Sequence, residues 1–109
     1  MLAIKTKTGK TKKLNTACEK YNLRLYIAGQ TPKAITALKN LRLICEDMLK
    51  GNYRINVIDL LKFPQLGRKD QILAIPTLMR VQPHPKRLII GDLSNTERVL
   101  AGLGLKWSD

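Results

Sequence analysis

Few residues in this chain of 109 are of the types that carry out chemistry. It has two cysteines, Cys18 and Cys45, and one histidine, His84, which lies between two prolines. None of the three has a His or Cys partner at the spacing of metal ligands. Cys45 falls on an apolar helical stripe, which predicts a small buried packing residue rather than a reactive thiol. The sequence therefore predicts no metal site and an exposed loop histidine.

Carboxylates and glycines are also too scattered to build an active site. Asp59 ends an apolar run and Asp92 precedes a predicted helix; both can be structural, and no third group completes a catalytic set. The glycines stand alone as turn or cap residues and form no phosphate-binding loop. We expect a protein without enzymatic activity and without a cofactor.

The first half of the chain carries clear signals for three elements. Residues 23–28 alternate as a strand whose apolar face carries Leu23, Leu25 and Ile27. Thr31 can cap a helix over residues 32–50, with a proline in its first position and Gly51 just past its end. The apolar stripe of this helix consists of Ala34, Leu38, Leu41, Cys45 and Met48. Residues 53–61 are apolar on both faces, which predicts an interior parallel strand.

The sequence signals for secondary structure are weaker in the second half of the chain. Pro64 can start a helix, but Gly67 weakens it because glycine disfavours a helix interior. Residues 77–81 and 87–90 predict the two strands of a hairpin with a proline-stiffened loop. The sequence SNTE at 94–97 matches a capping box and opens a short last helix, which glycines interrupt at its end.

This order of elements, with a proline opening the third strand, is typical of a thioredoxin-type α/β domain. A redox enzyme of that type needs C-x-x-C just after its first strand, where a helix N-terminus stabilises the thiolate. The matching residues 28–33 are AGQTPK and contain no sulfur. The scaffold is therefore expected to bind a partner, and a thiol-redox function is disfavoured.

The chain is strongly basic, with a formal net charge of +12. Residues 1–20 hold six lysines against one glutamate and show no sustained apolar period. We expect a mobile basic arm over residues 1–21, one domain over 22–105 and a short tail over 106–109. A basic nucleic-acid-binding module is an alternative function, although the chain has no recognisable reading motif and such binding would be weak.

The hydropathy of the sequence indicates where in the cell the protein is expected. No apolar run approaches the roughly 20 residues that span a bilayer. The N-terminus lacks the apolar stretch and cleavage site of a secretory signal. We expect a cytoplasmic protein that does not contact membranes.

Four motifs carry a more specific resemblance. They are LYIAGQTP at 25–32, VIDLLK with PQL at 57–66, ILAIPTL at 72–78 and IIGDLSN at 89–95. In register, from about residue 23 to residue 105, they resemble the bacterial circadian clock protein KaiB family. The sensor domain of clock-associated histidine kinases is a weaker resemblance.

The resemblance implies a non-enzymatic regulator that binds the N-terminal ATPase ring of the KaiC-type ATPase, in a circadian or stress-response system. It implies a thioredoxin-like fold (βαβαββα) in that complex. It also implies a metamorphic chain: an alternative ground-state fold, in which the second half is rebuilt, often as a homo-oligomer (dimer or tetramer).

The resemblance also assigns roles to individual residues. The positions that bear on the fold switch are Tyr21, Pro76, Gly102 and Gly104, the last replacing an Asp common in the family. The positions of partner contact are Lys62, Pro64 and Gln65. Simpler structural roles exist as well, since a proline can start a strand and a glycine can end a helix. The family's run of three prolines is PHP here, the acidic C-terminal tail is missing and a basic arm is added. These differences favour a role outside a full cyanobacterial clock.

Overall fold

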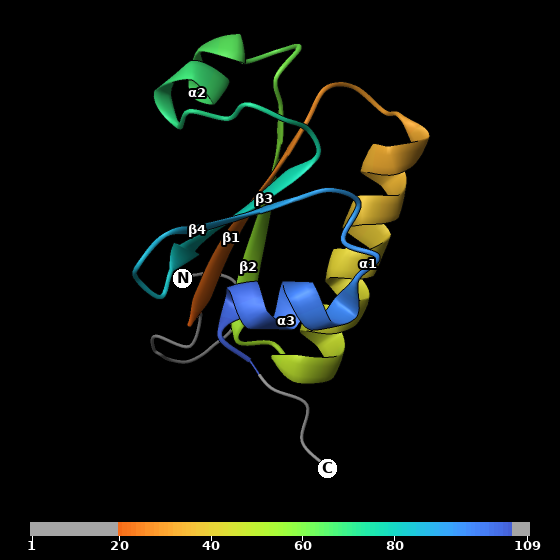
Figure 1. Cartoon of the computed structure of the whole chain (residues 1–109), viewed down its shortest axis with the longest axis vertical. Helices are drawn as coiled ribbons and strands as arrows, with labels where there is room; N and C mark the ends of the chain where they lie inside the picture. The colour runs from red at the N-terminus through yellow and green to blue at the C-terminus, as the bar shows by residue number, and fades with distance from the viewer. Residues whose placement is uncertain (1–19, 106–109) are drawn as a thin grey trace, which may run out of the picture.

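The computed structural model describes residues 20–105, which form strands and helices in the predicted βαβαββα order (Figure 1). The strands are β1 (Tyr21–Ile27), β2 (Tyr53–Asp59), β3 (Thr77–Gln82) and β4 (Arg87–Ile90). The helices are α1 (Pro32–Met48), α2 (Pro64–Lys69) and α3 (Thr96–Leu103). None of the helices in this part of the chain is long and apolar enough to cross a membrane. The expected arm up to residue 19, with Cys18, and the tail at 106–109 lie outside the described residues.

The four strands form one mixed sheet in the order β2-β1-β3-β4. β1 pairs in parallel with β2 and antiparallel with β3, and β4 extends the sheet as the predicted hairpin. The expected interior position of residues 53–61 is wrong, because among the strands of residues 20–105 β2 pairs only with β1 and forms an edge of this sheet. Apolar residues on both faces do not reveal how many neighbours a strand has, and Val57 is 43% exposed.

The core lies on one face of the sheet, where α1 and α3 pack (Figure 1). β1 contributes the three predicted side chains, Leu23, Leu25 and Ile27. Burying one such side chain stabilises the fold by about 1.5–3 kcal/mol. The buried face of α1 is turned from the predicted stripe and consists of Ala34, Ala37, Leu41, Ile44 and Cys45. The predicted Leu38 and Met48 are only partly buried at its margin.

Tyr21, which the sequence assigned to the arm, is the first residue of β1. It is 9% exposed, and its N–H donates to the Asn52 carbonyl at 3.0 Å. Residue 21 therefore belongs to the sheet.

The caps of the two long helices show what local sequence can decide. Thr31 caps α1 as predicted, its Oγ1 accepting from the N–H of Ala34 at 3.1 Å. The cap of α3 is Asn95 and not the Ser94 of the capping box, and Asn95 Oδ1 accepts from the N–H of Arg98 at 3.1 Å. Asparagine and serine cap helices about equally well, so the sequence alone does not determine which of the two caps α3.

Candidate protein-binding surface beside α2

The turn from β1 into α1 lies where a redox enzyme of this fold would carry its thiols. Gly29 has φ +76, and its N–H donates to Asp59 Oδ1 at 3.0 Å. The same carboxylate oxygen accepts from the N–H of Leu61 at 2.9 Å. Asp59 thus joins the ends of β1 and β2, and its position is explained by structure alone.

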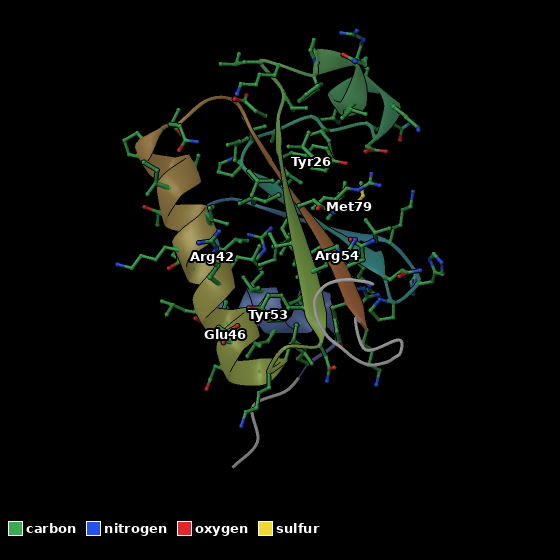
Figure 2. All side chains as sticks on the ribbon, turned by 180° about the vertical axis from the view of Figure 1, so that it is seen from behind. Tyr26, Arg42, Glu46, Tyr53, Arg54 and Met79 are labelled. Atoms are coloured by element: carbon green, nitrogen blue, oxygen red, sulfur yellow. The ribbon has the colours of Figure 1, made fainter. Side chains whose placement is uncertain are left out.

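A polar network fixes α2 to the sheet. Asp70, which follows α2, accepts a hydrogen bond from the hydroxyl of Tyr26 and forms an ion pair with Arg24, Nη1 to Oδ2 at 3.2 Å. Figure 2 shows Tyr26 on the sheet close to α2. Burial, together with the hydrogen bond to Asp70, raises the pKa of Tyr26. The sequence analysis did not predict this network. The one indication of it in the sequence is an aromatic residue, Tyr26, on the polar face of β1.

Gly67, predicted to weaken α2, is the residue that lets α2 approach its neighbours. It is buried, and a Cβ at this position would lie 3.1 Å from the side chain of Leu60. The short helix thus depends on tertiary contact rather than on helix propensity.

Exposed apolar side chains flank α2 on both sides. Leu61 and Phe63 precede the helix and are 72% and 49% exposed, while Leu73 and Ile75 follow it at 95% and 46%. The predicted contact residues Lys62, Pro64 and Gln65 are exposed in the same segment. We call these seven residues the α2 surface. A hollow of about 360 Å³ adjoins it between Ile75, Pro76 and the start of α1.

The predicted fold-switch residues do not form one cluster. Pro76 is buried just before β3, after a cis peptide bond, and its carbonyl accepts from the N–H of Gly91 at 2.9 Å. Gly102 lies inside α3, where a Cβ would be 2.4 Å from Cδ1 of Ile89. Gly104 caps α3 at φ +77, and a Cβ there would be 3.2 Å from Nη1 of Arg80. Tyr21 lies at the start of β1, so the four residues are spread over the sheet and α3.

Little in the described residues could carry out catalysis. Cys45 is fully buried, and burial raises the pKa of its thiol to about 12, so it is a packing residue as predicted. His84 is exposed in the β3–β4 loop, as predicted. Asp92 accepts hydrogen bonds from Ser94, which hold the pKa of its carboxyl below the usual range. Within residues 20–105, no three His, Cys, Asp or Glu side chains come together as a metal site requires.

Comparison with known proteins identifies the family. Residues 24–105 match the model of the KaiB domain. The circadian clock oscillator protein KaiB of Rippkaea orientalis is 54% identical over 89 residues, which cover 82% of this chain and 86% of that protein. The chain belongs to the KaiB family. A second KaiB, from Thermostichus vulcanus, is 55% identical over 82% of both chains.

Solved structures confirm the predicted thioredoxin-like fold of this KaiB-family chain. The N-terminal domain of SasA from Synechococcus elongatus superposes with a TM-score of 0.67 at 16% identity, covering 93% of this chain and 99% of that domain. Mitochondrial thioredoxin 3 from Saccharomyces cerevisiae gives a TM-score of 0.64 at 15% identity, covering 80% of each chain. At these identities the likeness concerns the fold alone.

Proposed function

We propose that this KaiB-family protein is a non-enzymatic regulator that binds the N-terminal ATPase ring of a KaiC-type ATPase, in a circadian or stress-response system. The α2 surface is the observation that carries this proposal. It places four exposed apolar side chains around Lys62, Pro64 and Gln65. Apolar side chains gathered beside polar ones on a surface are typical of a protein-binding site. The names of its relatives, circadian clock oscillator proteins, support a regulatory role.

We further propose that the free protein is cytoplasmic and can form a homo-oligomer, a dimer or tetramer, in an alternative fold. Tyr21, Pro76, Gly102 and Gly104 are the residues proposed to set the balance. The packing of α3 supports this role for the two glycines, since each leaves room for a side chain of the hairpin, Ile89 or Arg80.

The binding proposal is tested with a purified KaiC-type ATPase and a double variant of the α2 surface, Lys62→Glu with Leu73→Ser. Both side chains are exposed, so the fold should be kept. We expect the double variant to lose most of its binding in size-exclusion chromatography. The matched control is Arg87→Glu with Leu88→Ser, the same types of change on β4, which should bind as the wild type does. Equal loss in both, or in neither, would contradict the proposal.

The fold balance is tested by NMR over a dilution series of the wild-type protein. Two sets of peaks, whose ratio depends on concentration, are expected for residues 62–105. Association stabilises whichever fold forms the oligomer, so dilution should favour the monomeric form. A single unchanged set of peaks would show that the chain has one fold.

A further inference from the structure

A second hollow lies on another flank of the molecule, between α1 and the edge strand β2. Its volume is about 480 Å³. Residues of both elements that line it are strongly exposed: Ile35 and Leu43 on α1 are 55% and 61% exposed, and Val57 on β2 is 43% exposed. Leu25 and Ile27 of β1 and Ala34 and Leu38 of α1 complete its apolar lining. We call this hollow the α1–β2 groove.

The groove exists because the helical layer over the sheet stops short of β2. The register pairs Leu23 with Ile55 and Leu25 with Val57, so these β2 residues share the core face of the sheet. α1 and α3 pack against β1, β3 and β4 on that face, whereas Ile55 is only partly buried and Val57 is exposed. A sheet of this kind normally buries its apolar face under helices. One more helix, beside α1 and over β2, would complete the layer.

The charges around the groove indicate what kind of helix fits. Lys39, Arg42 and Glu46 line it. The carboxylate of Glu46 accepts a hydrogen bond from the hydroxyl of Tyr53, and Figure 2 shows both residues on this flank with Arg42. In the part of the chain from 20 to 105, neither Lys39 nor Arg42 forms an ion pair. The two cations are therefore available to a negatively charged partner.

Like charge disfavours the occupants that this chain could itself supply. A second copy seated on the groove would bring the same lysine and arginine side chains, in a protein of net charge +12. The first 20 residues carry six lysines and one glutamate and would be repelled in the same way. Juxtaposed like charges oppose association, whereas carboxylates facing Lys39 and Arg42 would favour it.

We propose that the α1–β2 groove is a docking site for an acidic amphipathic helix of another protein. The stretch of α1 from Ile35 to Glu46 is about 16 Å long. Along this length, apolar side chains at positions i, i+3 or i+4 and i+7 of the incoming helix can contact Ile35, Leu43 and Val57. Its carboxylates then lie toward Lys39 and Arg42. The groove shares no residue with the α2 surface, and its lining meets the 360 Å³ hollow beside that surface at Ile27 and Ala34.

The test uses a helical peptide with leucines at positions i, i+3 or i+4 and i+7 and glutamates at the other positions. A control peptide, the basic twin, has lysine in place of every glutamate. Peptide is added to the isotope-labelled full-length protein and followed by NMR. We expect the acidic peptide to shift the signals of Ile35, Leu43 and Val57, and the basic twin to leave them unchanged. Leu43→Glu should weaken acidic-peptide binding by about tenfold or more. The control Leu88→Glu, an exposed leucine on β4, should bind as the wild type does.

Several results would overturn the inference. They are no shift with the acidic peptide, equal binding of the basic twin, or shifts confined to the α2 surface. Concentration-dependent shifts of the groove residues without peptide, with no second set of peaks for residues 62–105, would identify a second copy as the occupant instead. Leu43→Glu should still bind the KaiC-type ATPase, so failure of the groove proposal and failure of the proposed function give different results.

Discussion

The elements in the two halves of this domain are defined by different kinds of interaction. In the first half, from β1 to β2, local signals mark the start of the helix: Thr31 caps α1 and a proline follows the cap. The helix ends at Met48, two residues before the predicted end at residue 50, and Gly51 lies two residues after its C-cap Leu49. In the second half, elements are held by contacts with residues distant in sequence. α2 depends on Asp70 and its partners on β1, and α3 depends on the fit between Gly102 and Ile89. The second half is therefore the part in which a few side chains decide the geometry.

The backbone shows the same difference. Outside glycine, φ is positive in residues 20–105 at Lys50, Gln71 and Leu93, with values of 45°, 57° and 65°. The last two lie in the second half, one after α2 and one before α3. A left-handed conformation costs about 1–2 kcal/mol for such residues. Tertiary contacts must offset this cost at two positions of the second half and at one position, Lys50, of the first half.

The largest expected effect compares one buried leucine from each half, Leu41 in α1 and Leu103 in α3. Both are 0% exposed, and truncation to alanine should lower the free energy of unfolding by about 2–5 kcal/mol. Leu41→Ala should reduce hydrogen-exchange protection throughout the domain. Leu103→Ala should reduce protection in β4 and α3 first, because Leu103 lies in α3, which packs on β4. Uniform loss of protection in both variants would show that the halves unfold as one unit.

A smaller effect is expected at the attachment of α2. Asp70→Ala leaves the hydroxyl of Tyr26 and the guanidinium of Arg24 without their shared acceptor, which should cost about 1–3 kcal/mol. Amide exchange should accelerate in residues 64–76 and hardly change in α1. The neighbouring Lys69→Ala, an exposed position, is the control and should have little effect. If both variants behaved alike, the Asp70 network would not be what holds α2.

Both glycines of α3 should resist replacement by alanine, for different reasons. At Gly102 the new Cβ would lie 2.4 Å from Cδ1 and 2.6 Å from Cγ1 of the buried Ile89, so Gly102→Ala should lower the free energy of unfolding by about 1–3 kcal/mol in spite of the better helix propensity of alanine. At Gly104, with φ +77, alanine should destabilise the helix end by about 1–2 kcal/mol. Urea unfolding followed by far-UV circular dichroism measures both changes. A gain of stability in Gly102→Ala would mean that Ile89 can move aside, so that the helix propensity of alanine prevails.

The smallest expected effect lies in the first half and depends on pH. The hydrogen bond to Glu46 is the main reason why the pKa of Tyr53 rises to about 12 in the folded protein. A raised pKa means that the folded state retains the proton, so this stabilisation is complete below the unfolded pKa of about 10 and is lost as pH rises toward 12. The stability difference between wild type and Tyr53→Phe should be constant up to about pH 10 and shrink above it. A difference that does not vary with pH would show that the hydrogen bond is not formed.

The sequence alone was sufficient to predict those parts of the fold that depend on residues close together in the chain. The Thr31 cap, the apolar face of β1 and the proline-stiffened hairpin loop all depend on near neighbours, and all are present in the fold. The edge position of β2 could not be predicted, because strand order depends on how β1 and β3 pair across the chain.

The candidate surfaces could likewise be predicted only where they depend on residues close together in the sequence. Lys62, Pro64 and Gln65, which the resemblance assigns to partner contact, are exposed, and their contact with a partner stays a prediction. The Asp70 network could not be predicted, because it joins residues 44 and 46 positions apart. The α1–β2 groove could not be predicted from any motif either, since it exists because no helix within residues 20–105 covers β2 beside α1.

The central place of β1 has a mechanical consequence. β1 begins at Tyr21, so a force applied through the preceding residues acts on a strand that is bonded on both sides. Such a pull loads the ladders to β2 and β3 in shear, and many hydrogen bonds must break together. A force applied beyond Leu105 acts first on α3, which can detach turn by turn. Tension between the two ends of the domain should therefore release α3 while the centre of the sheet is still intact.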